Sequence, residues 1–142
     1  RCETDAVNID IKTMLHRVVA EGFDQNYAVE DATSSSDPSR PAVRVISRLA
    51  PKRTAIIRAS YVWIDAFVPE LNVQTSVLNE GEVESEKVDE LRRLCLVMHA
   101  YLRGEGRIVQ RRRLLGRGTS PVLKIELDGH QWILGRNHWS VR

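Results

Sequence analysis

Cysteine is scarce in this chain of 142 residues, which contains only Cys2 and Cys95. Two thiols cannot build the disulfide framework of a small secreted domain, so we expect both to be free in a reducing compartment. No apolar run approaches the roughly 20 residues that a membrane span requires, and no signal-peptide pattern occurs at the start. We therefore expect a soluble chain with no membrane partner, located in the cytoplasm or in a virion.

The sequence also lacks the short motifs that carry common chemistries. It has no P-loop, HExxH, CxxC pair, GxSxG or EF-hand pattern, and its four histidines lack the spacing of metal ligands. The glycine pairs Gly104-Glu-Gly106 and Gly116-Arg-Gly118 lack the strand–turn–helix context of a nucleotide loop, so they indicate a helix stop and a hairpin turn. We therefore predict no catalytic motif, no metal site and no cofactor.

What is present is an ordinary globular composition with an uneven distribution of charge. The chain is 42% hydrophobic and 28% charged, which suits one domain over residues 1–142. Its net charge of +2 combines −4 over residues 1–100 with +6 over residues 101–142. A basic last third can meet an acidic partner, nucleic acid or the acidic part of a second copy.

Two segments have the spacing of amphipathic helices. Apolar residues recur at steps of three and four over residues 6–21 and again over Glu84–Leu102, where Gly104 and Gly106 end the pattern. Between them, residues 24–41 are polar and rich in turn formers, which predicts a mobile surface loop within the domain.

The remaining segments alternate as strands do. The predicted strands are Ala42–Leu49, Thr54–Val68, Asn72–Leu78, Arg107–Leu115, Val122–Leu127 and His130–Arg136. The second half of Thr54–Val68 is apolar on both sides, which predicts a central strand or one covered by a partner. Asp128-Gly129 predicts a type I′ hairpin turn with Ile125 opposite Trp132. The result is an α+β fold with a mixed or antiparallel sheet and two helices, in the order α-β-β-β-α-β-β-β.

Asp65 is a candidate polar core site. Alternation places it on the same face as Tyr61, Trp63 and Phe67, where a carboxylate is costly unless it is paired. It would act either as a catalytic acid or as a nuclease-type metal ligand with Glu126 and Lys124. The order Lys124-Ile-Glu126 reverses the usual acid-x-Lys pattern, so the sequence favours a strand-end carboxylate that an arginine caps, or a register shift at a bulge.

The densest charge cluster lies after the long helix. It consists of Arg107, Arg111, Arg112, Arg113 and Arg117. These side chains could contact phosphates, with Trp132, Trp139 and Arg136 supplying stacking. The aromatic pattern of a known RNA module is absent, so a solvated or subunit-facing basic rim remains the alternative.

Two short patches and the order of elements resemble a family of phage proteins. The patches are Arg40-Pro-Ala-Val-Arg-Val45 and Trp63-Ile-Asp-Ala-Phe-Val-Pro69, followed by a Glu-rich helix. They resemble the tail-terminator and head–tail joining proteins of long-tailed phages, over about residues 6–102. The resemblance implies a ring-forming structural subunit without a catalytic site. The Leu71–Leu78 segment and the C-terminal hairpin depart from the family's pattern.

The sequence leaves three classes of function open. The first is a non-enzymatic assembly or protein-binding subunit, which the absent chemistry, the charge split and the two-sided apolar strand favour. The second is a nucleic-acid-binding protein that uses residues 107–117. The third is a small enzyme with a dispersed site near Asp65, in which His99 is the other candidate.

Overall fold

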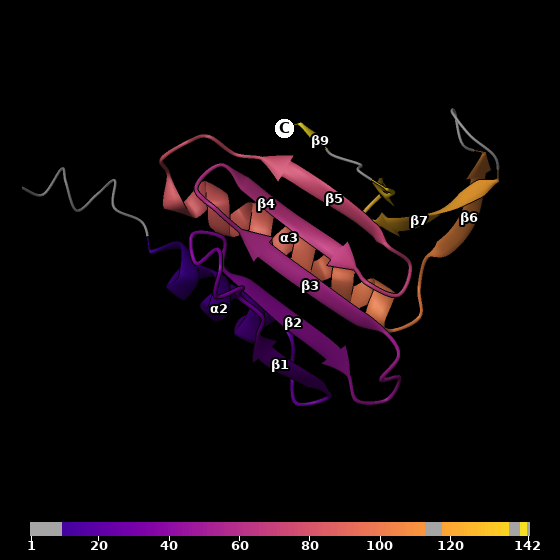
Figure 1. The fold of residues 1–142 in the computed structure, drawn as a ribbon, viewed down its shortest axis with the longest axis horizontal. Coiled ribbons are helices and arrows are strands. Elements are labelled where there is room, and N and C mark those ends of the chain that lie inside the picture. Colours follow the sequence, from indigo (N-terminus) through magenta and orange to yellow (C-terminus); the bar gives the residue numbers. More distant parts are fainter. Residues whose placement is uncertain (1–9, 113–117, 137–139, 142) are drawn as a thin grey trace, which may run out of the picture.

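The structure is a computed structural model that describes residues 10–112, 118–136 and 140–141. Within these residues the chain forms two helices and nine strands (Figure 1), so the predicted α+β class is confirmed. In chain order they are α2 (Ile11–Gly22), β1 (Tyr27–Asp31), β2 (Ala42–Ser47), β3 (Thr54–Ala59), β4 (Trp63–Val68), β5 (Val73–Leu78), α3 (Glu84–Leu102), β6 (Arg107–Arg112), β7 (Thr119–Leu127), β8 (His130–Leu134) and β9 (Ser140–Val141).

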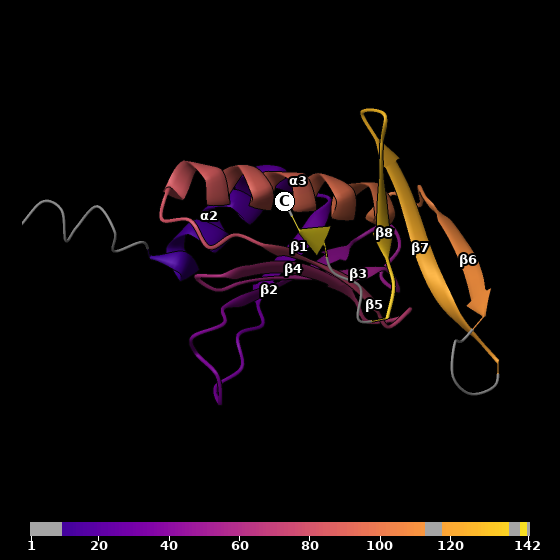
Figure 2. The ribbon, with the colours of Figure 1, turned by 90° about the horizontal axis from the view of Figure 1, so that it is seen from above.

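The larger sheet has one face covered by helices. Its six strands follow the order β1-β2-β3-β4-β5-β9, antiparallel except for the parallel pair β5–β9. Figure 2 shows α2 and α3 on the same side of this sheet. Strand side chains that point toward the helices, among them Val45, Ile57 and Ala66, join one hydrophobic core with Leu94 and Met98 of α3. The other sheet face carries the polar residues of the same strands, as period-two alternation requires.

The predicted long strand Thr54–Val68 is wrong, because the chain turns back at Ser60. β3 and β4 form an antiparallel hairpin in which Ala59 faces Ile64, and Ser60 N–H donates to Trp63 O at 2.7 Å. The turn exchanges the two faces, so Ile57 and Ala59 of β3 and Ile64, Ala66 and Val68 of β4 all point into the one core. The two-sided apolar strand that suggested cover by a partner therefore does not exist.

The predicted loop over residues 24–41 is wrong at its start. Tyr27–Asp31 forms β1, which pairs with β2 along its whole length. Turn-forming residues dominate only the later part of the segment, which projects from the sheet face opposite the helices (Figure 2). The predicted strand Ala42–Leu49 is also too long, since Leu49 lies beyond β2 and is 87% exposed.

The helix α3 ends in a Schellman motif that directs the chain into the second sheet. Gly104 has a φ of +91°, its N–H donates to Tyr101 O, and Glu105 N–H donates to Ala100 O. Glycine suits this left-handed position because it has no Cβ. The helix stop predicted at Gly104 is confirmed. Cys95 lies in the buried stripe of α3 as a free thiol, and burial raises its pKa to about 12.

The smaller sheet has the order β6-β7-β8 and lies at one end of the molecule, crosswise to the larger sheet (Figure 2). Asp128 and Gly129 both have positive φ, and Ile125 faces Trp132, so the predicted hairpin and its register are confirmed. β8 is shorter than predicted, since Gly135 instead exchanges two backbone hydrogen bonds with Gln74 of β5. Of the predicted strand Arg107–Leu115, β6 covers residues up to Arg112, and the rest lies outside the described residues.

A buried lysine fastens α3 to two turns of the larger sheet. Lys87 is 1% exposed, and its Nζ donates to Tyr61 O at 2.6 Å, to Asn79 O at 2.8 Å and to Asn79 Oδ1 at 3.2 Å. Burial lowers the pKa of this amine, but three oxygens around it satisfy its three donors. The β3–β4 turn, the end of β5 and α3 therefore share one polar junction.

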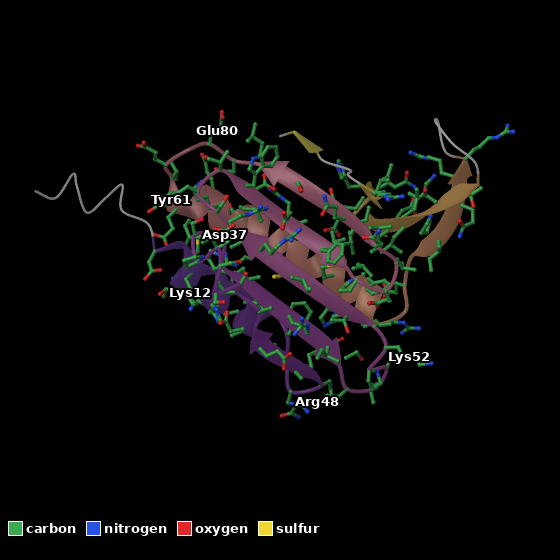
Figure 3. The ribbon with its side chains drawn as sticks, in the orientation of Figure 1. Lys12, Asp37, Arg48, Lys52, Tyr61 and Glu80 are labelled. Carbon is green, nitrogen blue, oxygen red and sulfur yellow. The ribbon has the colours of Figure 1, made fainter. Side chains whose placement is uncertain are left out.

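Replacing this lysine should weaken the fold. Lys87→Met keeps a long unbranched side chain but leaves the oxygens of Tyr61 and Asn79 buried without their donor. We expect a loss of about 2 kcal/mol in the free energy of unfolding, measured in urea. The exposed Lys12 (labelled in Figure 3) gives the matched control, because Lys12→Met should change stability by less than about 0.5 kcal/mol. Equal stability of the two variants would contradict a structural role for Lys87.

Candidate functional site

Asp65 lies in the middle of β4 on the sheet face that the helices leave open. It is 4% exposed and sits directly opposite Arg58 of β3. Arg58 Nε donates to its Oδ1 at 2.9 Å, and Arg40 Nη2 lies 3.6 Å from Oδ2. Both carboxylate oxygens thus face a guanidinium. The sequence favoured pairing with an arginine, but at a strand end, whereas Asp65 lies within β4.

The arginine beside Asp65 also organises its neighbours. The Arg58 guanidinium lies over the Phe67 ring, 5.7 Å from its centroid, and its Nη2 donates to Gln74 Oε1 at 3.4 Å. Arg58, Asp65 and Gln74 border a shallow groove of about 730 Å³ that also includes Arg40 and Ser76. The groove is polar, but its one carboxylate is already paired with two cations.

The dispersed enzyme site suggested by the sequence is not assembled. His99 packs on the helix side of the sheet, with its ring centroid 5.5 Å from that of Phe23 and 5.1 Å from that of Tyr27, whereas Asp65 lies on the open face. Burial among these rings lowers the pKa of His99, which favours the neutral imidazole.

The proposed metal partners of Asp65 are separated from it as well. Lys124 and Glu126 belong to β7 of the other sheet, whereas Asp65 belongs to β4. Within residues 10–112, 118–136 and 140–141, no group of three or more His, Cys, Asp or Glu side chains could hold a metal ion. The nuclease-type arrangement therefore has no geometric basis.

The basic residues lie on a projecting pair of strands, which we call the β6–β7 arm (Arg107–Arg112 and Thr119–Leu127). β6 is the outermost strand of its sheet (Figure 1), and all of its residues except Val109 are exposed. Arg107, Arg111 and Arg112 all lie exposed on this strand. Arg113 and Arg117 lie outside the described residues.

The arm has two unfavourable features in water, a pair of like charges and an exposed apolar side chain. Arg107 sits directly opposite Lys124, and like charges at facing positions of a sheet destabilise the pair. Ile108 sits opposite the buried Leu123 but is itself 54% exposed. An acidic group and an apolar contact would relieve both features.

Sequence reasoning missed an acidic groove at the start of α3. The groove has a volume of about 360 Å³, and its lining includes Glu80, Glu86, Asp89 and Glu90. Glu90 is 8% exposed. Its Oε2 lies 3.2 Å from Arg93 Nη1 in an ion pair, while its buried Oε1 has no hydrogen-bond partner among the described residues. The signal in the sequence was the presence of six acidic residues within 80–90. Acidic residues at this place are also expected simply because they complement the helix dipole.

Comparisons with known protein families, with curated proteins and with solved structures found no match. The resemblance to phage tail-terminator and head–tail joining proteins therefore stays a prediction. In the described part of the chain, no helix is both long and apolar enough to cross a membrane.

Removing the charge of Asp65 should expose its structural role. Asp65→Asn leaves Arg58 and Arg40 without their counter-ion, and we expect a loss of about 1–2 kcal/mol in the free energy of unfolding. The loss is below that of a fully buried pair because both guanidinium groups are partly exposed. Glu30→Gln, which removes an exposed partner of Arg44, is the control and should cost less than about 0.5 kcal/mol. A neutral effect of Asp65→Asn in chemical denaturation would reject the role.

Proposed function

We propose that this chain is a non-enzymatic assembly subunit that associates with further copies of itself through the β6–β7 arm. The observation that carries the proposal is the form of β6. It is an outermost strand with basic residues and a 54% exposed Ile108, and it projects beyond the main body of the molecule (Figure 1).

An outermost strand of this kind is a natural docking element. One side of its backbone lacks a neighbouring strand within the described residues, and such an edge can pair with a strand of another molecule. Natural proteins blunt free edges with charged side chains. The arginines here do so against nonspecific pairing, and they favour a partner surface of opposite charge.

The rest of the molecule agrees with a structural role. The candidate enzyme residues Asp65 and His99 lie on opposite faces of the sheet, and Asp65 is committed to two ion pairs. A ring, as the resemblance to phage joining proteins implies, requires an interface between two different surfaces of each copy. The arm supplies one of them.

Association through the arm should depend on concentration and on salt. The wild-type protein should show a mass that rises with concentration in light scattering, and added salt should reduce that mass by screening charge. Reversing Arg107, Arg111 and Arg112 to Glu should give a folded monomer, with circular dichroism as the check on folding. A wild-type protein that stays monomeric throughout would reject the proposal.

The control for this experiment moves the same charge elsewhere. Lys12, Arg48 and Lys52 lie on the surface away from the arm (Figure 3). Their reversal to Glu changes the net charge equally, so it should leave association intact. Loss of association in this control would point to net charge rather than the arm.

A second candidate is nucleic-acid binding, favoured by the exposure of Arg107, Arg111 and Arg112 on one strand. Phosphate contacts of this kind release counterions, so the logarithm of the binding constant falls linearly with the logarithm of the salt concentration. Stacking by Trp132 is not part of this candidate, because that ring is 6% exposed and belongs to the core. Trp139, the other proposed stacking residue, lies outside the described residues.

The same variants separate this candidate from protein assembly. A labelled single-stranded oligonucleotide should lose affinity for the protein when the three arm arginines are reversed, and the salt slope should shrink by about one for each phosphate contact removed. Fluorescence anisotropy gives both quantities. Equal affinity of the wild-type, arm and control proteins would exclude the arm as a nucleic-acid site.

A further inference from the structure

We infer that the acidic groove at the start of α3 receives the β6–β7 arm of a second copy of this chain, head to tail. The inference rests on the proposed function and adds the surface that the arm contacts. The charged residues that line the groove are Glu80, Glu86, Asp89 and Glu90, together with Arg93, which is paired with Glu90. Three features favour a second copy as the occupant: the positions of the two surfaces, their charges and the chemistry of the groove.

The two surfaces lie at opposite ends of the molecule. Both views place the start of α3 at one end of the long axis and β6 at the other (Figures 1 and 2). The 19 residues of α3 separate these ends by about 28 Å at 1.5 Å per residue. The Schellman motif at Gly104 sends β6 further away, so the arm of one molecule cannot fill its own groove.

The charges of the two surfaces are complementary. Residues 80–90 contain six acidic side chains and one lysine, and that lysine, Lys87, is buried among backbone oxygens. Residues 107–112 contain three arginines and no acid. Opposite potentials of this kind favour the correct pairing and discourage pairing of like ends, because two arms or two grooves repel each other.

One residue that lines the groove has an unmet hydrogen-bond acceptor. Glu90 lines it, and the buried Oε1 of that carboxylate has no partner among the described residues. A buried carboxylate oxygen without a donor is costly, and a guanidinium is the donor that pairs best with it. Arg93 already occupies the other oxygen, so an arginine from a second molecule would complete the pair.

An apolar contact accompanies the charges. Leu78, at the end of β5, lines the groove, and Ile108 presents an exposed apolar side chain among the arm's arginines. Protein interfaces combine such an apolar centre with a polar rim. Because the groove and the arm are different surfaces of one chain, the contact repeats from copy to copy and gives a closed ring or an open filament.

A mixing experiment tests this pairing. The groove variant carries Glu80→Lys, Glu86→Lys and Asp89→Lys, and the arm variant carries the three arginine reversals described above. Each variant alone should be monomeric in light scattering, with an association constant at least about tenfold below that of the wild type. An equimolar mixture should associate again, because the intact arm of the groove variant meets the intact groove of the arm variant, and the two reversed surfaces are also opposite in charge.

The outcomes separate the inference from the proposed function. If the groove variant associates like the wild type while the arm variant does not, the arm binds elsewhere on the second copy, and the groove assignment is overturned while the assembly function stands. If the wild type does not associate, the groove assignment and the assembly function are both rejected. A mixture that stays monomeric also overturns the pairing.

Two controls keep the result interpretable. Asp24→Lys, Glu30→Lys and Asp37→Lys add equal positive charge outside the groove and should leave association intact. If the groove variant unfolds in circular dichroism, Glu80→Gln with Glu86→Gln and Asp89→Asn removes the charge with little change of shape. This neutral variant should lower the association constant as well, and an unchanged constant would overturn the assignment.

Discussion

The burial of α3 is the interaction on which the rest of the structure depends. Its apolar stripe packs into one core with residues of both sheets, including Ile57 and Ile64 of the larger sheet and Leu123 and Ile125 of the smaller one. Each fully buried Leu or Met in such a core contributes roughly 1.5–3 kcal/mol relative to its exposed state. The smaller sheet packs on α3 through β7, and it also contacts β5 of the larger sheet directly, where Gly135 bonds to Gln74.

The position of α3 also determines where charge is displayed. Its first turns carry Glu84 and Glu86, which suit the positive end of the helix dipole, and Lys87 anchors this end to the sheet through three oxygens. Its last turn ends at Gly104, and the basic β6 follows at once. One helix therefore separates an acidic end from a basic end, and the proposed head-to-tail contact rests on that separation.

Ion pairs, rather than a covering helix, stabilise the open face of the larger sheet. Asp65 would be costly on a half-buried face without partners, and Arg58 and Arg40 supply them from a neighbouring strand and from the loop before β2. The Arg58 side chain also lies over Phe67. This arrangement lets a two-layer fold keep aromatic and charged groups together on a face that no described helix covers.

Local patterns in the sequence predicted the elements whose signals are local. The spacing of Leu91, Leu94 and Met98 identified α3, and Asp128-Gly129 identified a turn that needs positive φ at both residues. The hairpin between β3 and β4 was missed because Ser60-Tyr-Val-Trp63 has neither glycine nor proline, and its alternation reads as a continuous strand. β1 was missed because its exposed residues, such as Glu30 and Asp31, gain stability only from pairing with β2.

The sequence by itself determined the class of fold, the long helix, the register of the last hairpin and the charge of each part of the chain. These features follow from residue periodicity, from turn chemistry and from counting. Only the tertiary structure decided which charges meet. It paired Asp65 with two arginines and placed His99 on the other side of the sheet. It also placed the acidic and basic segments at opposite ends of the molecule, because these distances depend on how α3 packs and not on separation along the chain.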